Sequence, residues 1–505
     1  MMHKRKFLGL IVLFAFASFY TLYAGGYKIK VKINHLSNTE VMLAHYMGKN
    51  IYPDDTAYLD QSGEGVFEGD EPLTGGMYIV YLPNKKYFDL LIGDDQKFSI
   101  KNDTSDLLDN LSVSGSEINQ AFIEHQKFLR NKRNERKELQ KTLDDLKTKR
   151  KKKKIKEEMI RINEEVKEHT NKMIEEYSGT FLAVFLKALE EIDVPDPPKD
   201  EEGNIDSTFQ YRYYKDHYFD HFDIGNPRLL RTPIYEQKIM KYMKYVTPQI
   251  PDSLIVAVDT LISMARADKE TFRFVLIKLF NHFAGSKILG MDAVYVHIAE
   301  NYYIPEAEWS DPDFIKKLKK NVKEMKPLLI GKKAPDIEMI EISTEHFIRA
   351  RDDTALITNP YVFKRKLNLY DIDAKYIILY FWERDCGHCR EYTPKLYEIY
   401  QDFEEEDVEM ISFNMIMGKE GKKKWIEFIN EHELYDWINA WNPFSYEFKK
   451  EYNIKATPAL FLLDEDKKIV AKKLAPEQVR EVLDNLIHGK KKPIIQKSEM
   501  ETTQQ

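Results

Sequence analysis

The feature that most constrains this chain is the segment KYIILYFWERDCGHCREYTP, residues 375–394. It holds Cys386 and Cys389, the only two cysteines among 505 residues. An apolar run over residues 376–382 is followed by a short polar turn, Cys-Gly-His-Cys, and an amphipathic stretch broken by Pro394. This order predicts a buried strand that leads directly into the N-terminus of a helix.

Two cysteines three positions apart at the start of a helix suit dithiol chemistry. We expect Cys386 to lie where unpaired backbone N–H groups and the helix dipole stabilise a thiolate. Cys389, one turn further along, can attack a mixed disulfide and resolve it. His388 adds a neighbouring imidazole that favours the anionic sulfur.

Two other roles for such a pair compete with this one. Half of a zinc site needs two more soft ligands, and the chain has no third cysteine. A purely structural disulfide would close a very short loop, which gives little chain-entropy stabilisation. The spacing therefore favours a redox-active pair and no metal.

Residues 380–394 resemble the strand, Phe-Trp pair, CxxC and helix of the thioredoxin superfamily. Trp382 stands at the family's tryptophan position, and Pro394 matches the proline that kinks the active-site helix. The resemblance implies that Cys386 and Cys389 are catalytic. It also implies that Trp382 shapes the site.

A second segment, YNIKATPALFLLDEDKKIV (residues 452–470), resembles the part of the family that carries a cis-proline, here Pro458 after Thr457. X–Pro bonds are the ones in which a cis form is easily accessible. The resemblance implies that Pro458 packs beside the dithiol and that Thr457 offers backbone to the substrate. Within the Cys-Gly-His-Cys tetrapeptide, Gly387 and His388 would tune the redox potential.

The chain departs from the family pattern at two positions. The family's buried acid, six residues before the first cysteine, is replaced by Tyr380. Asp385 stands where an aromatic residue commonly precedes the first cysteine. The proton acceptor for resolution is therefore open, and Glu383, Asp385 and Glu391 are candidates by their nearness in sequence.

Residues 1–24 are typical of a secretory signal. A basic stretch, residues 3–6, precedes an apolar run over residues 7–20, and Ala24 precedes Gly25-Gly26 at a cleavage position. An uncleaved membrane anchor is the alternative, since the apolar stretch nears spanning length. No cysteine follows the apolar run, so a lipoprotein anchor is not expected. Either form places the chain in the periplasm or cell envelope, where thiols tend to oxidise.

Residues 25–115 show short runs of alternating polarity divided by Gly, Asn and Asp, which predicts a small antiparallel β domain of sandwich type. The segment resembles the small β domain of unknown function that precedes thioredoxin-like modules in envelope proteins. It shows no set of residues that would form a catalytic site. The chain has a net charge of −7 and a pI near 6.1, so its overall charge does not favour nucleic-acid binding.

Residues 116–178 are helical and highly charged in pattern. Two coiled-coil-like seams, Leu139-Leu143-Leu146 and Ile155-Met159-Ile162-Val166, lose register across the lysine-rich run 147–156. The break predicts either the tip of a helical hairpin or a stutter in one long helix. The lysines could contact anionic lipid or nucleic acid, but a solvated helix face is the favoured interpretation.

Residues 179–328 predict an all-α domain, with amphipathic helices near 234–248, 252–268, 270–283 and 289–301. It resembles helical accessory segments of unknown function. An aromatic stretch near its start contains polar side chains that could form a metal site: Asp216, His217, Asp220, His221 and Asp223. His217 and His221 could share a helix face. The interleaved Tyr and Phe instead favour a helix that packs on its neighbours.

Residues 329–490 form the α/β thioredoxin-like module of this multidomain chain, and residues 491–505 a polar, disordered tail. The opening GKKAPDIEMIEI is similar to the GxxAPxF motif of the exported cytochrome-maturation and peroxiredoxin-like branch. From the strand over 376–382 onward the pattern predicts β-α-β-α-β-β-α. An insertion with Trp437 and Trp441 is expected before the cis-proline segment.

These observations predict an exported thiol–disulfide oxidoreductase that needs neither metal nor organic cofactor. Its partners would be protein thiols and disulfides and a membrane or soluble electron donor. Cys-Gly-His-Cys resembles the tetrapeptide of disulfide isomerases, whereas the opening motif points to the reductive branch and favours a reductase. The alternative is an envelope scaffold protein whose dithiol is regulatory or structural, since most of the chain lies outside the module.

Overall fold

The computed structural model describes residues 25–489 apart from residue 354, residues 357–364 and residue 417. The predicted signal, 1–24, and tail, 491–505, lie outside the described residues. The chain divides into two compact units, Met1–Met240 and Lys241–Gln505. The predicted succession of β, all-α and α/β regions is confirmed, and the division falls inside the segment 179–328.

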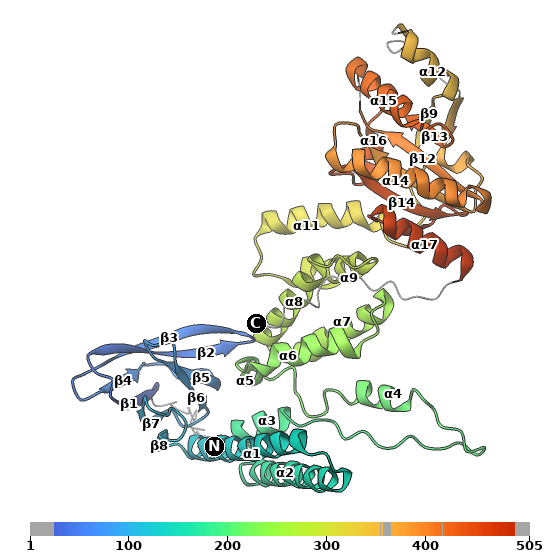
Figure 1. Ribbon diagram of the computed structural model, residues 1–505. Helices are drawn as coiled ribbons and strands as arrows, with labels where there is room; N and C mark the ends of the chain where they lie inside the picture. Colours follow the sequence, from blue (N-terminus) through green and yellow to red (C-terminus); the bar gives the residue numbers. More distant parts are fainter. Residues whose placement is uncertain (1–24, 354, 357–364, 417, 490–505) are drawn as a thin grey trace, which may run out of the picture. The chain divides into compact units, whose positions relative to one another are not determined.

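The N-terminal region is a β domain of two four-stranded sheets, β4-β1-β7-β8 and β3-β2-β5-β6 (Figure 1). Alternate side chains of these strands point inward and form one apolar core. Neighbouring strands are antiparallel as predicted, with one correction: β1 pairs with β7 in parallel. The strands are β1 Lys28–Asn34, β2 Thr39–Met47, β3 Asn50–Leu59, β4 Glu64–Glu68, β5 Gly76–Tyr81, β6 Tyr87–Ile92, β7 Lys97–Asp103 and β8 Ser112–Ser114.

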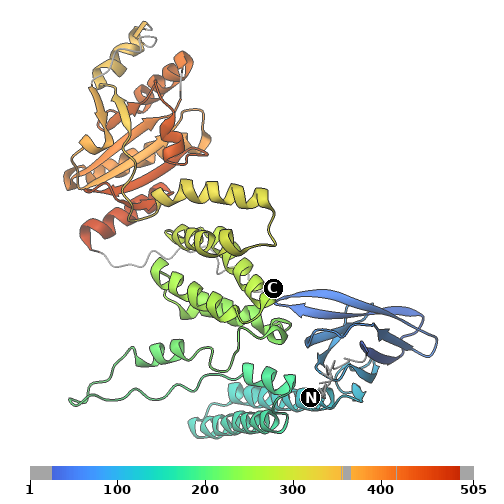
Figure 2. The same ribbon diagram turned by 180° about the vertical axis from the view of Figure 1, so that it is seen from behind.

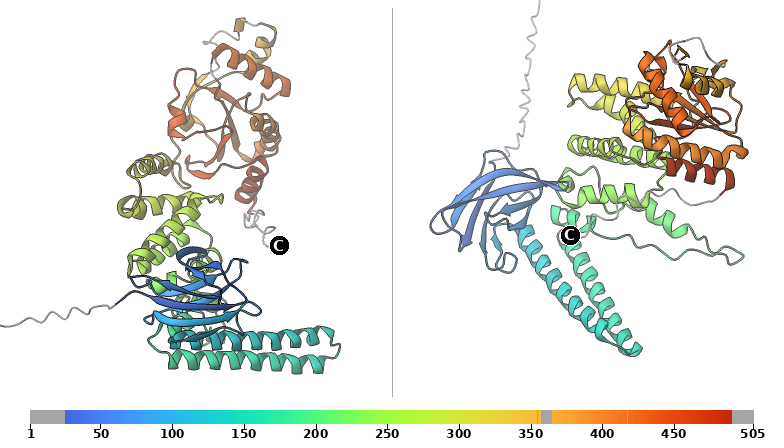
Figure 3. Two further views of the ribbon diagram at one scale, coloured as in Figure 1. Left: turned by 90° about the vertical axis from the view of Figure 1, so that its left-hand side faces the viewer. Right: turned by 45° about the horizontal axis from the view of Figure 1, so that its top comes forward.

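The charged segment that follows is a helical hairpin of α1 (Glu117–Asp145) and α2 (Lys149–Glu176), seen side by side in Figure 3. The turn lies at residues 146–148, at the start of the predicted register break, so the hairpin alternative is the correct one. Its base is fastened to the β domain by Asn119, whose side chain bonds both the N–H (2.8 Å) and the carbonyl (2.7 Å) of Leu91.

Shorter helices complete the first unit and open the second. The helices predicted near 234–248, 252–268, 270–283 and 289–301 are confirmed. The elements are α3 Phe181–Ala188, α4 Phe209–Asp216, α5 Pro227–Leu230, α6 Ile234–Lys241, the π-helical η1 Tyr242–Val246, α7 Pro251–Ala265, α8 Lys269–Ala284, α9 Met291–Ile298, the π-helical η2 Ala299–Tyr303, α10 Ile304–Glu306, α11 Pro312–Met325 and the 3₁₀ turn η3 Lys326–Leu328. Among the described helices, none combines the length and apolar character that crossing a bilayer requires.

The two histidines of the aromatic stretch do not share a helix face. Helix α4 ends at Asp216, and His217 follows as its C-cap. His217 Nδ1 lies 2.6 Å from Asp220 Oδ2, whereas His221 Nδ1 lies 3.2 Å from Glu190 Oε2. Over the described ranges, no group of three or more His, Cys, Asp or Glu side chains is placed to hold a metal ion.

The C-terminal region is an α/β domain with a seven-stranded sheet of order β10-β9-β13-β12-β11-β14-β15. Two apolar cores cover its two faces, and Figures 1 and 2 show the sheet from opposite sides. The elements are β9 Glu338–Glu341, α12 Thr344–Asp352, β10 Arg365–Asn368, η4 Leu369–Asp371, β11 Tyr376–Trp382, α14 Gly387–Phe403, η5 Glu404–Glu406, β12 Val408–Asn414, α15 Gly418–His432, β13 Ile438–Trp441, α16 Glu447–Glu451, β14 Ala459–Asp464, β15 Ile469–Lys472 and α17 Pro476–His488.

Three strands of this sheet were not predicted: β9 and β10, which precede the strand over 376–382 where the predicted order begins, and β13. The segment expected as an insertion with Trp437 and Trp441 contains β13, which pairs in parallel with β12 and antiparallel with β9. All four residues of β13 are buried. A strand that is covered on both faces shows no polar–apolar alternation, so the pattern used for prediction is absent from it.

Candidate active site

The site is built where β11 ends and α14 begins. Side chains of β11 alternate between the two cores, so Tyr380 and Trp382 point to the face that α14 covers, whereas Phe381 points to the other. Cys386 is the N-cap of α14, as the strand-to-helix prediction requires. The dithiol is therefore fixed at the carboxyl end of a strand that has neighbours on both sides.

Cys386 is the accessible member of the pair. Its side chain is half-buried, and its Sγ accepts a hydrogen bond from the backbone N–H of Cys389 at 3.3 Å. The same thiol donates to the carbonyl oxygen of Thr457 at 3.3 Å. The sulfur thus lies between a backbone donor at the helix N-terminus and a backbone acceptor in the cis-proline segment.

Cys389 is fully buried in the core that α14 covers. Burial, with a hydrogen bond to Cys386 as the second cause, raises the pKa of the Cys389 thiol well above its ordinary value. Both cysteines are free thiols in this structure. An incoming sulfur therefore meets Cys386 first, and Cys389 must lose a proton before it can act as a nucleophile.

The predicted proline segment lies against the dithiol. The Thr457–Pro458 peptide bond is cis, and the Thr457 carbonyl is the group that accepts from Cys386. On its other side, the Thr457 hydroxyl donates to Glu383 Oε1 at 2.8 Å. Thr457 thus links the turn before Cys386 to the strand that follows Pro458.

Trp382 and Tyr380 belong to the same apolar core as Cys389. Trp382 is fully buried, donates from Nε1 to Ser412 Oγ at 2.8 Å and lies nearly parallel to the Tyr380 ring, with centroids 6.3 Å apart. The Tyr380 hydroxyl lies 3.1 Å from Thr393 Oγ1. Burial raises the pKa of Tyr380 far above its ordinary value, so its hydroxyl stays neutral and does not replace the family's acid as a base.

The three candidate proton acceptors have different surroundings. Asp385 is exposed and pairs with Lys424 at 3.0 Å. Glu391 is exposed and pairs with Lys395 at 2.9 Å, a hydrogen bond that lowers the pKa of the Glu391 carboxyl. Glu383 is half-buried, and of the three it is the one held to Thr457, across the dithiol.

The two middle residues of the tetrapeptide face solvent. His388 lies on the first turn of α14, with its ring centroid 6.0 Å from that of Tyr392. At Gly387 an added methyl group would meet no heavy atom within 4 Å. The fold itself therefore does not require glycine at this position, and a side chain here would point into open space.

Sequence reasoning missed two side chains that complete the site. Thr393 donates from Oγ1 to the Cys389 carbonyl at 2.7 Å and also contacts Tyr380. Its position four residues after Cys389 on the same helix was the available signal. Ser412 accepts from Trp382 across a parallel strand pair, and nothing local in the sequence indicates that pairing.

Comparison with known proteins agrees with this geometry. Residues 373–469 match the family described as thioredoxin-like. Residues 27–122 and 147–325 match two domain families of unknown function, DUF4369 and DUF5106.

Two curated relatives match part of the chain. Thiol-disulfide oxidoreductase ResA of Bacillus cereus is 26% identical over 129 residues, which is 24% of this chain and 68% of the relative. Sporulation thiol-disulfide oxidoreductase A of Bacillus subtilis is 28% identical over 107 residues, 21% of this chain and 64% of the relative. A solved domain of a possible thiol-disulfide isomerase from Cytophaga hutchinsonii is 32% identical and aligns with 32% of this chain and 96% of its own, with a TM-score of 0.26.

Proposed function

The C-terminal domain belongs to the thioredoxin superfamily of thiol-disulfide oxidoreductases, and from this premise we propose that the protein is an exported enzyme that exchanges disulfides with envelope proteins, acting as a reductase. One observation carries the proposal. A half-exposed thiol at a helix N-cap, Cys386, lies beside the buried thiol of Cys389 and opposite the carbonyl that precedes a cis-proline.

A single turnover needs only the reduced chain and a substrate disulfide. The Cys386 thiolate attacks one substrate sulfur, a mixed disulfide forms, and the other substrate sulfur leaves as a thiolate. Cys389 then loses its proton and attacks Sγ of Cys386, which forms the intramolecular disulfide and releases the second substrate thiol. Two electrons pass from the dithiol to the substrate, so a membrane or soluble donor must reduce the pair again.

The substrate strand would be held by Thr457 and Pro458. The Thr457 backbone already accepts from Cys386, so an extended peptide can replace that contact while its sulfur approaches. His388 and Gly387 would set the potential and leave room for the partner. Export to the periplasm or envelope is supported by the sequence of residues 1–24.

The reduction potential of the Cys386–Cys389 pair tests the direction of electron flow. The measurement is an alkylation gel shift after equilibration in redox buffers. A reductase should show a potential near or below about −250 mV. A value near or above about −190 mV would instead indicate an oxidant or isomerase.

Single cysteine variants separate an enzyme from a scaffold. Cys386→Ser should abolish reduction of insulin, because the attacking sulfur is lost. Cys389→Ser should accumulate mixed disulfides, because the resolving sulfur is lost. Full biological function in both variants would favour the scaffold alternative, in which the dithiol is regulatory or structural.

A further inference from the structure

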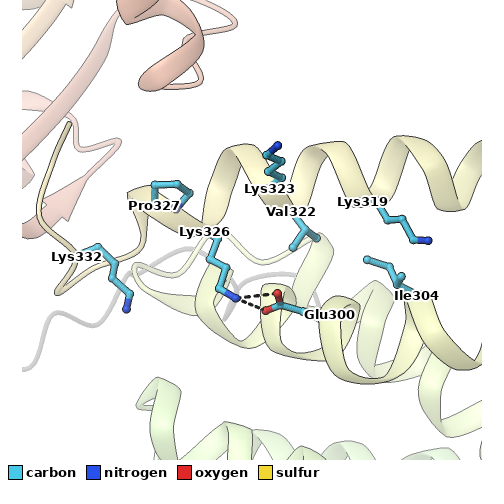
Figure 4. A pocket seen from close by; sticks show the side chains of 8 residues that line it. All are labelled: Glu300, Ile304, Lys319, Val322, Lys323, Lys326, Pro327 and Lys332. Atoms are coloured by element: carbon cyan, nitrogen blue, oxygen red, sulfur yellow. Dashed lines mark hydrogen bonds and ion pairs between the residues drawn. The ribbon is translucent and has the colours of Figure 1, made fainter. Parts of the chain in front are cut away.

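Away from the dithiol, a cavity of about 520 Å³ opens beside α11 (Figure 4). Its apolar lining comes from Ile304 on α10, Val322 on α11 and Pro327 in η3. Its charged lining consists of one glutamate and four lysines: Glu300, Lys319, Lys323, Lys326 and Lys332.

The acid of this cavity is already neutralised. Both oxygens of Glu300 lie 2.7 Å from Lys326 Nζ, and Figure 4 shows that pair. Within the described part of the chain, Lys319, Lys323 and Lys332 make no ion pair. Three exposed ammonium groups therefore surround an apolar surface without an internal counterion.

The four lysines of the cavity belong to one lysine-rich stretch of the chain. Residues 316–333 contain eight lysines and one glutamate, a net charge of +7 in a chain whose net charge is −7. All eight lysines are exposed, whereas Leu318 and Val322 of α11 are buried. The apolar side of α11 is used for packing within the protein, so its lysine-covered side is the surface that an anionic membrane can contact.

The residue types favour a lipid over a small tightly bound anion. The stretch holds lysine and no arginine. Lysine acts as a point charge, whereas closely fitted phosphate sites prefer the bidentate fork of arginine. Ile330, 36% exposed, adds apolar surface next to Lys332. Clusters of four to eight lysines on an amphipathic helix attract anionic lipid headgroups.

The geometry points to anionic phospholipid at a membrane surface as the ligand of this cavity. Lys319, Lys323 and Lys332 are spread along the cavity (Figure 4), so they would contact the headgroups of several neighbouring lipids, while Ile304 adds apolar lining between them. Docking through this surface would hold the second unit at the membrane. It does not depend on the chemistry of the dithiol.

The test is sedimentation of the full chain with vesicles of phosphatidylcholine, with and without phosphatidylglycerol. The protein should sediment with the phosphatidylglycerol vesicles and not with pure phosphatidylcholine. A triple variant, Lys319→Gln with Lys323→Gln and Lys332→Gln, should bind the phosphatidylglycerol vesicles roughly 100-fold more weakly. Each lysine near an anionic surface contributes a comparable share of the binding free energy, and the three losses add.

The matched control removes three lysines from the hairpin instead: Lys152→Gln, Lys153→Gln and Lys156→Gln. This variant should bind as the unchanged protein does, and both variants should keep their circular dichroism spectra and reduce insulin at an unchanged rate. Equal loss in both variants would overturn the proposal, since general charge would then explain binding. Equal binding to both vesicle types, or release by glycerol phosphate at concentrations similar to the lipid phosphate, would also overturn it.

Discussion

At the scale of single residues, Glu383 is the one of the three candidate proton acceptors that is linked to the dithiol, through Thr457. The family's acid position holds Tyr380, whose hydroxyl stays neutral, while Glu383 is held at the dithiol by the Thr457 hydroxyl. We infer that this carboxylate accepts the proton of Cys389 through water.

We therefore expect Glu383→Gln to slow the resolution step roughly 10- to 100-fold and to change its dependence on pH. The measurement is the rate at which a preformed mixed disulfide on Cys386 releases its thiol, followed between acidic and alkaline pH. Asp385→Asn is the matched control, since Asp385 is tied to Lys424 instead of to Thr457. If the pH profile of Glu383→Gln is unchanged, a group other than Glu383 accepts the proton of Cys389.

A second prediction at this scale concerns stability. Trp382→Phe removes the buried hydrogen bond to Ser412 and leaves a void under Tyr380. The free energy of unfolding should fall by about 2–4 kcal/mol, measured by urea denaturation. Ser412→Ala keeps the indole and should lower it by about 1–3 kcal/mol, because the Trp382 N–H is then unsatisfied. A smaller loss for Trp382→Phe than for Ser412→Ala would contradict the packing argument.

Some residues of the site could be predicted from the sequence, and others could not. Cys386, Cys389 and Pro458 could be located because each belongs to a short motif with fixed spacing. The bond between Glu383 and Thr457 joins residues 74 positions apart. Such a contact depends on the register of β11 against β14, which no local pattern specifies.

At the scale of secondary-structure elements, the hairpin of α1 and α2 carries a buried histidine. His125 is 4% exposed, and its ring stacks on that of His169 with centroids 5.3 Å apart. Burial lowers the pKa of His125 from 6.5 to about 4. The unfolded chain therefore binds the proton more readily, and the hairpin loses stability as the pH falls from about 6.5 to about 4.

We expect the first unit to lose roughly 2 kcal/mol of stability over that interval through this group. His125→Phe keeps an aromatic ring and removes the titration. Urea denaturation of the two proteins at neutral pH and near pH 4.5 measures the difference. Identical losses in both proteins would mean that carboxylates elsewhere account for the acid sensitivity.

Some helices and strands were predicted more accurately than others, and the differences have physical reasons. Long helices with a clear apolar face were found near their true bounds because the 3.6-residue period is strong in them. Strand β13 was missed because it is short and buried on both faces. The parallel pairing of β1 with β7 was missed because alternation gives the buried side of a strand and not the direction of its neighbour.

At the scale of the whole molecule, the division into two compact units predicts two unfolding events. Calorimetry of the full chain should show two transitions. Oxidising Cys386 and Cys389 should shift only the transition of the second unit, because both cysteines lie there. Cys389→Ser should abolish that dependence on redox state. A single transition that moves as a whole with redox state would show that the units unfold together.

The buried position of Cys389 and the partial exposure of Cys386 have a practical consequence for the intact chain. A bulky maleimide should modify one thiol per reduced native molecule and two per unfolded molecule, without any mutation. The protein therefore carries its own single attachment point for a fluorophore or spin label. The same thiol count, taken over time in denaturant, reports the unfolding of the domain that performs the chemistry.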